Sequence, residues 1–185
     1  WTSAVDVPIN IIGNQEGFQN SGGYAGIIAF GRYSPNLNFR EYLQVKLSNI
    51  LSTGQKYYVS FRVSLAEYST FIVDDIGAYI SNAPVSSGVF SNLNYSPQIA
   101  NIQGQYLADS TYWRKISGSF IADGSEEFLT IGNFKDDLNT DTLRIHPNSW
   151  KFGEDVAYYY VDQVCLSTDS LICNPIIESI IENTY

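Results

Sequence analysis

Apolar residues alternate with polar ones along most of this chain, and this period of two constrains its fold more than any other feature. In the clearest run, Tyr57, Val59, Phe61, Val63 and Leu65 occupy every second position. A strand places successive side chains on opposite faces, so the pattern puts one face of this segment in a core. Shorter runs of the same kind span residues 43–47, 76–80, 116–120 and 129–131. The sequence therefore predicts a chain built mainly of strands.

Two other segments are apolar at nearly every position. They are Tyr24–Phe30 and Tyr158–Leu166, and central strands buried on both faces have this pattern. Turn signals such as Asp123-Gly124-Ser125 separate the strands. Strands separated by turns at this spacing predict an all-β fold, an antiparallel β-sandwich or jelly roll.

The length of 185 residues fits one domain of this kind. We expect the sandwich to occupy residues 1–173 and residues 174–185 to form a linker or a short helical tail, because isoleucines recur there at helical spacing. The chain contains no Met, so we expect it to be a piece of a longer protein.

Charge and hydropathy argue against two classes of partner. Ten Lys and Arg against 19 Asp and Glu give a net charge of −9 at pH 7. A nucleic-acid-binding protein needs a basic surface, and an anionic membrane would repel this chain. No apolar run approaches the roughly 18 residues that a membrane-spanning helix needs. The 14 Tyr and the low charged fraction of 16% are typical of an exported β-protein, so we expect a secreted or cell-surface location.

The chain has two cysteines, Cys165 and Cys173, eight positions apart. In an oxidising compartment they would form a disulfide that closes a short loop. Two reduced thiols are the alternative.

Acidic residues offer candidate chemistry of two kinds. Three carboxylate pairs, including Asp74-Asp75, are adjacent in sequence, and neighbours in a strand point to opposite faces, so such a pair cannot flank one bond. We therefore expect no catalysis. Calcium binding suits these carboxylate oxygens better than catalysis does. Asp137, Asn139 and Asp141 follow the spacing of the first half of a calcium loop, although the glycine expected next is absent.

Asp162 is a second candidate calcium ligand, because it interrupts the apolar run from Tyr158 to Val164. A buried carboxylate is costly unless it is paired or bound to metal. The alternative is an Asp that accepts hydrogen bonds from a neighbouring loop.

Aromatic residues in loops or at strand ends are candidate platforms for sugar rings, which stack on Tyr and Trp while amides and carboxylates bind the hydroxyls. The candidates are Tyr95, Tyr106, Tyr112, Trp113 and Trp150. Each of them can equally belong to the core or its rim. The long segment 82–105 has no clear period and is either a functional loop or a covering flap.

Several strings resemble a known family when they are taken together in this order. They are Gly23-Tyr-Ala-Gly-Ile27, Arg40-Glu-Tyr-Leu-Gln-Val45, Tyr57-Tyr-Val-Ser-Phe61, Asp75-Ile-Gly-Ala-Tyr79, Trp113 with Ser117-Gly118, Ile131-Gly-Asn-Phe-Lys-Asp-Asp137 and Tyr158-Tyr-Tyr-Val-Asp-Gln-Val164. The set is similar to the carbohydrate-binding-module-like, galactose-binding-like jelly-roll domain of Bacteroidota surface and secreted proteins. That domain occurs with gliding-motility, outer-membrane-protein-A-like or type IX sorting modules.

The resemblance covers about Val7 to Cys173 and implies export, no catalysis and a structural Ca²⁺ held by an Asp at the position of Asp162. Members usually begin with an Asn-Gly-x-Phe-Glu strand, which is not found before Val7. Either that strand was cropped or a partner supplies it.

The leading hypothesis is a non-catalytic extracellular module that binds a glycan or mediates adhesion at the outer face of the outer membrane. The alternative is a structural or accessory subunit held to a protein partner in a cell-surface assembly.

Exported Bacteroidota proteins can carry O-glycans on an Asp-Ser or Asp-Thr motif followed by an apolar residue or Thr. Ser110, Thr142 and Ser170 fit this motif. Ordinary turn caps have the same sequence.

Overall fold

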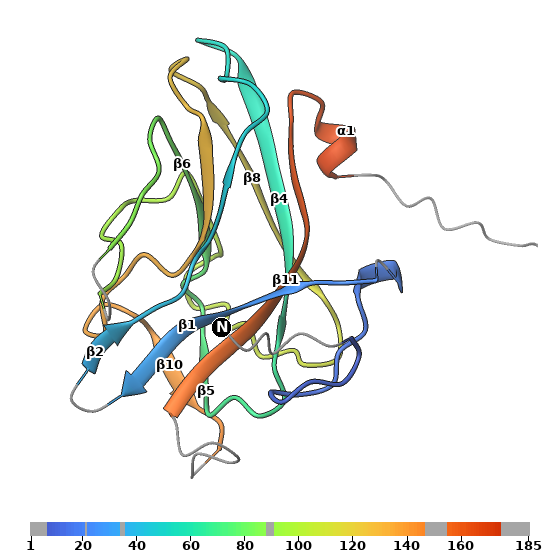
Figure 1. The fold of residues 1–185 in the computed structure, drawn as a ribbon, viewed down its shortest axis with the longest axis vertical. Coiled ribbons are helices and arrows are strands. Elements are labelled where there is room, and N and C mark those ends of the chain that lie inside the picture. The colour runs from blue at the N-terminus through green and yellow to red at the C-terminus, as the bar shows by residue number, and fades with distance from the viewer. Residues whose placement is uncertain (1–6, 21, 34–35, 88–90, 147–154, 175–185) are drawn as a thin grey trace, which may run out of the picture.

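The computed structural model describes residues 7–20, 22–33, 36–87, 91–146 and 155–174 (Figure 1). Nearly all of its regular elements are strands. In chain order they are β1 (Ala25–Tyr33), β2 (Asn36–Phe39), β3 (Leu43–Lys46), β4 (Lys56–Leu65), β5 (Phe71–Val73), β6 (Gly77–Ser81), β7 (Ile99–Ala100), β8 (Arg114–Ile121), β9 (Phe128–Gly132), β10 (Thr142–Arg144) and β11 (Asp155–Ser167). Two short helical turns, η1 (Phe18–Asn20) and α1 (Ser170–Cys173), flank them in the sequence.

The strands form two sheets and one isolated pair. The larger sheet has the order β2-β1-β11-β4-β8, the smaller has the order β3-β9-β6-β7, and β10 pairs with β5. Every registered strand pair is antiparallel. Apolar residues of both sheets meet in one core. The predicted all-β antiparallel sandwich is confirmed.

Strand β4 shows why the alternation predicts this fold. Val59, Phe61 and Val63 are fully buried between the sheets, where they meet Leu129 and Ile131 of β9. Even-numbered residues of β4 point away from the core. Burying the odd-numbered set in one core stabilises the sandwich through the apolar area removed from water.

The two continuously apolar segments are central strands, as predicted. Strands β1 and β11 pair with each other inside the five-stranded sheet. Tyr159 of β11 lies in the main core, whereas Tyr158 and Tyr160 belong to a second cluster on the opposite face with Tyr24 and Trp113. Both faces of β11 are therefore covered along this stretch.

Residues 7–20 cover that outer face without joining a sheet. Their only pairing of strand type is an isolated bridge between Ile9 and Asn14. Side chains hold the segment in place: the Gln15 amide donates to Ser64 Oγ at 2.7 Å, and the Trp113 indole donates to Glu16 O at 2.9 Å. No strand of either sheet lies within residues 7–20.

The predicted tail lies mostly outside the described residues, since residues 175–185 are not among them. The described part ends just after α1, whose first turn is capped by the Asp169 carboxylate, which accepts from Leu171 N at 2.8 Å. No helix among the described residues has the length and apolar character needed to cross a membrane.

Candidate functional site

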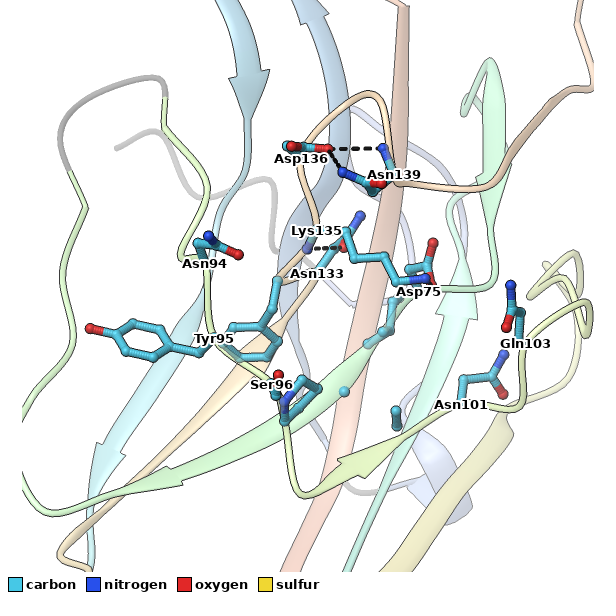
Figure 2. A pocket seen from close by; sticks show the side chains of 15 residues that line it. Asp75, Asn94, Tyr95, Ser96, Asn101, Gln103, Asn133, Lys135, Asp136 and Asn139 are labelled. Atoms are coloured by element: carbon cyan, nitrogen blue, oxygen red, sulfur yellow. Dashed lines mark hydrogen bonds and ion pairs between the residues drawn. The ribbon is translucent and has the colours of Figure 1, made fainter.

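A pocket of about 530 Å³ lies at one end of the smaller sheet (Figure 2). Three segments line it: the start of β6 at residues 75–77, the loop around β7 at residues 94–103, and the loop after β9 at residues 133–139. We call it the loop pocket. Seven of its 15 lining residues carry an amide or a carboxylate, and the three segments are far apart in the sequence.

Asn133 fixes the loop that follows β9. Its side chain is fully buried and donates to Ala29 O and to Thr140 Oγ1, both at 3.0 Å. Its own oxygen accepts from Lys135 N at 2.9 Å. Thr140 Oγ1 in turn donates to Asp136 O at 2.7 Å. Because one buried amide is bonded to both ends of this loop, its backbone is held in a defined shape.

An ion pair joins two walls of the pocket. Lys135 Nζ lies 2.6 Å from Asp75 Oδ1, and the Asp75 side chain is only 9% exposed. The other Asp75 oxygen accepts from Asp141 N at 2.9 Å. Figure 2 shows Lys135 and Asp75 approaching each other across the pocket. The charge of Lys135 is therefore neutralised where it faces a ligand.

The third wall depends on the close approach of β7 to β6. A Cβ added to Gly77 would lie 2.6 Å from Ile99 O, so only glycine admits this packing. The Gln98 side chain continues the pairing, because it accepts from Ile80 N and donates to Ile80 O, each at 2.8 Å. Asn101 closes the turn by donating to Gln105 O at 2.7 Å.

Tyr95 stands at the rim of the loop pocket. Its ring stacks on Tyr79 with centroids 4.7 Å apart and planes inclined by 17°. In Figure 2 the ring points away from the Asp75–Lys135 pair, toward the outside of the pocket. Tyr95 is 42% exposed, so it can offer apolar surface to a ligand that extends beyond the pocket.

Below the rim, Phe134 lies against Tyr79 and Tyr42. The Tyr42 hydroxyl donates to Asn133 O at 2.6 Å and accepts from Leu93 N at 2.9 Å. Burial raises the pKa of Tyr42 to about 12, so this hydroxyl stays protonated at physiological pH. The aromatic group supports the pocket from beneath.

The exposed polar groups give the pocket its chemistry. Asn94, Gln103 and Asn139 are exposed on its lining, and each amide can donate and accept hydrogen bonds. With a neutralised cation and no exposed nucleophile–base pair among its described residues, the loop pocket is suited to binding hydroxyl-rich ligands.

The other aromatic candidates lie outside this pocket. The Tyr106 hydroxyl is hydrogen-bonded to the Asp141 carboxylate, which raises the pKa of Tyr106 to about 12. Trp113 is half-buried and its ring lies 5.8 Å from that of Tyr24. Tyr112 is 72% exposed. Trp150 lies outside the described residues. Only Tyr95 among the described aromatic candidates contributes to the loop pocket.

The three residues with calcium-loop spacing have three different partners. Asp137 lies 2.9 Å from the buried Arg40, the Asn139 amide donates to Asp136 Oδ1 at 2.7 Å, and the Asp141 carboxylate accepts from Tyr106. Within the described ranges, no three His, Cys, Asp or Glu side chains are grouped so that they could hold a metal ion. Bound calcium stays a prediction.

Asp162 connects β11 to the N-terminal segment. Its Oδ2 accepts from Phe18 N at 2.8 Å and its Oδ1 accepts from Gln163 N at 2.6 Å. Two backbone amides thus donate to this carboxylate inside an otherwise apolar strand. This is the hydrogen-bonded alternative that the sequence left open.

Cys165 and Cys173 are joined by a disulfide between β11 and α1.

The three O-glycan candidates are all half-buried. Ser110 lies in the loop before β8, Thr142 begins β10 and Ser170 begins α1. Modification of these residues stays a prediction.

Sequence reasoning missed most of the loop pocket. Asp75 was considered only as a possible catalytic carboxylate, and Lys135, Asn94 and Gln103 were not singled out. The available signal was the long segment 82–105, whose residues 94–103 do line the pocket. Which residues would face it across the fold depends on packing between distant segments.

No protein-family model matches the sequence, and no curated protein matches it. Among solved structures, the chain is similar to the apo form of the PbXyn10C CBM, with 13% identity over 76% of this chain and a TM-score of 0.34. The match spans 64% of the PbXyn10C chain, which is less than two thirds of its length.

Two adhesin structures are similar at the same level. The K1 cleaved adhesin domain of Lys-gingipain from Porphyromonas gingivalis W83 has 16% identity and a TM-score of 0.39. The K3 adhesin domain of the same protein has 13% identity and a TM-score of 0.36. Each match covers 80% of this chain and 75% of the adhesin chain. At these values the likenesses assign no ligand or partner to this chain.

Proposed function

We propose that this chain is a non-catalytic module that binds a neutral saccharide in the loop pocket, outside the cell or at its surface. The observation that carries the proposal is a pocket with fixed walls and exposed amides, bordered by one partly exposed tyrosine. Binding sites of this kind have few polar groups that fix orientation, together with apolar surface that supplies contact area. A disulfide agrees with an oxidising location.

Rigidity favours binding, because little conformational entropy is lost when the ligand docks. Asn133 and the Asp75–Lys135 pair already fix the walls by contacts within the protein. The exposed amides of Asn94 and Gln103 are then available to exchange water for sugar hydroxyls.

A glycan array followed by calorimetry on the protein tests the proposal. Gln103→Ala and Tyr95→Ala should each weaken binding of a neutral oligosaccharide at least fivefold without lowering the melting temperature. Gln105→Ala and Tyr112→Ala are matched controls, because both residues are exposed and neither lines the pocket. Their affinity should equal that of the unmodified chain.

Equal affinity in all four variants would place saccharide binding elsewhere, and loss only in Tyr112→Ala would move the site to the loop before β8. A stoichiometric protein partner that co-purifies with the chain, with no saccharide bound by any variant, would favour the alternative of an accessory subunit in a cell-surface assembly.

A further inference from the structure

A second pocket of about 540 Å³ lies on the outer face of the five-stranded sheet. The turn η1 and the disulfide-linked loop ending in α1 lie on this side of the sheet (Figure 1). We call it the sheet-face pocket, and it shares no lining residue with the loop pocket. Its lining includes Phe18, Gln19, Ser60, Arg62, Lys115 and Gln163.

Two cations stand side by side in this pocket. Arg62 of β4 and Lys115 of β8 are direct cross-strand partners, and both point away from the core. Like charges in this position destabilise a sheet. The chain has only ten Lys and Arg among 185 residues, so crowding does not force this pairing. Burial lowers the pKa of Lys115, and the nearby Arg62 lowers it further.

The neighbouring carboxylate does not balance both charges. Asp162 is the cross-strand partner of Arg62 on the other side, so Lys115, Arg62 and Asp162 form a row across three strands. Asp162 accepts hydrogen bonds from two backbone amides. Burial lowers the pKa of Arg62, and Asp162 opposes that shift only in part. Among the described residues, no carboxylate oxygen lies within 4.0 Å of a charged nitrogen of Arg62 or Lys115. The row keeps one unit of positive charge.

The pocket walls contain two residues in an unusual backbone conformation. Gln19 has φ 51° and Gln163 has φ 47°, which is the left-handed region that side chains other than glycine seldom adopt. Gln163 sits where the register between β11 and β4 shifts between Asp162 and Cys165. Such bulges are common beside binding sites, where they redirect a side chain. Gln163 at this bulge adds a second amide to the pocket lining, besides that of Gln19.

The Arg62 guanidinium is fixed by the Phe18 ring and keeps N–H donors available for an anion. Its guanidinium carbon lies 3.8 Å from the centre of the Phe18 ring, so the ring covers one face of the guanidinium plane. Within the described ranges, the one hydrogen bond that its guanidinium donates is a weak one to Trp113 O at 3.4 Å. Lys115 Nζ donates to Cys173 O at 2.7 Å. Of the five N–H donors of Arg and the three of Lys, several are left for a ligand.

We infer that the sheet-face pocket binds the carboxylate of an acidic sugar residue, at a site separate from the neutral-saccharide site. Arg62 and Lys115 would hold the carboxylate, and the Gln19 and Gln163 amides would bind neighbouring hydroxyls. A small ligand with one charge per residue fits best, because the net charge of −9 repels extended polyanions at long range. An acidic peptide offers a carboxylate but no ring hydroxyls for the two amides.

Calorimetry with digalacturonate as the probe tests this inference, with a neutral digalactoside as the matched sugar. Digalacturonate should bind, and Lys115→Gln should weaken its binding at least tenfold. Lys56→Gln is the matched control, since Lys56 is an exposed lysine on the same pair of strands that does not line the pocket. The affinity should also fall as salt is raised, because the contact is ionic.

The variant Gln163→Gly tests whether the Gln163 amide contributes to binding in the sheet-face pocket. Glycine accepts the positive φ, so the fold should persist while digalacturonate binding weakens. Equal affinity of Lys115→Gln and Lys56→Gln would overturn the inference. So would equal binding of the neutral digalactoside, or sulfate or a tetraglutamate peptide binding as tightly as digalacturonate. Neutral-sugar binding by Gln103→Ala reports only on the loop pocket. The proposal for each pocket can therefore be refuted without affecting the other.

Discussion

The substitution Asp137→Asn distinguishes a calcium ligand from a structural counter-ion. Arg40 lies beneath the loop after β9, and its side chain is fully buried. Its NH1 lies 2.9 Å from Asp137 Oδ1, an ion pair by distance rather than a well-aligned hydrogen bond. The same guanidinium donates to Phe39 O and to Thr140 Oγ1 and covers the Phe30 ring. Burial lowers the pKa of Arg40, and Asp137 opposes that shift by favouring the charged form.

Removing only the negative charge leaves a buried cation without its partner. Breaking a buried pair in this way costs about 3–5 kcal/mol. The Asp137 side chain is 18% exposed and Arg40 keeps its other acceptors, so we expect the lower end, about 3 kcal/mol. A chain of this size loses roughly 2–4 °C per kcal/mol, which gives a fall in melting temperature of about 6–12 °C.

Urea unfolding and calorimetry measure this loss, with and without EDTA. Asp141→Asn is the matched control: it removes an exposed carboxylate from the same calcium-like spacing and should change stability by less than about 1 kcal/mol. The double variant Arg40→Met with Asp137→Asn should lose less than the sum of the single changes, because the two groups interact directly. An Asp137→Asn chain as stable as the Asp141→Asn chain would refute the ion-pair reasoning. So would a loss that EDTA reproduces in the unmodified protein.

Three further outcomes are expected. If Asp162 helps to hold calcium, EDTA should lower the melting temperature of the unmodified chain but not of Asp162→Ala, because a ligand bound only by the folded state stabilises it; no EDTA effect would reject the metal. Intact-mass analysis of the protein from its native host should show O-glycans and the two hydrogens lost in the Cys165–Cys173 disulfide, and a bare polypeptide mass or two labelled thiols would reject the corresponding prediction. Burial raises the pKa of Asp74, so its contribution to stability falls as pH rises through the folded pKa; Asp74→Asn should raise the melting temperature at about pH 7 and give no gain at about pH 3, and an equal gain at both values would contradict this sign.

The strands could be predicted because their signal is local. About five consecutive residues are enough to show which side chains of a strand are buried. Strand β4 has the same alternation in the sequence and in the structure. The short elements were not predictable in this way. Strands β2, β7 and β10 have four residues or fewer, and their register depends on neighbours supplied by other segments. Gly77 could have been read as a turn residue, whereas its role is to admit the backbone of β7.

The candidate site was less predictable, because its chemistry depends on long-range contacts. Asp137 has calcium-loop spacing, yet its carboxylate forms an ion pair with Arg40, which follows β2 and is about 100 residues away in the sequence. Asn133 looks like an ordinary loop residue, yet it is fully buried and fixes the loop at both ends. A carboxylate or amide in a turn looks the same in the sequence whether it caps that turn, pairs with a distant cation or faces a ligand.

The two pockets differ in charge for a reason that the ion pairs make clear. In the loop pocket, Asp75 contacts Lys135 directly, so no positive charge is left uncompensated there and the exposed amides suit sugar hydroxyls. In the sheet-face pocket, one carboxylate, Asp162, faces the cross-strand pair of Arg62 and Lys115, so the charges of the row do not cancel. A chain with 19 acidic and ten basic residues thus retains a small positive site at this pocket. Ionic strength should therefore weaken only the binding of the acidic sugar, since screening acts on attraction between charges and not on hydrogen bonds between amides and neutral hydroxyls.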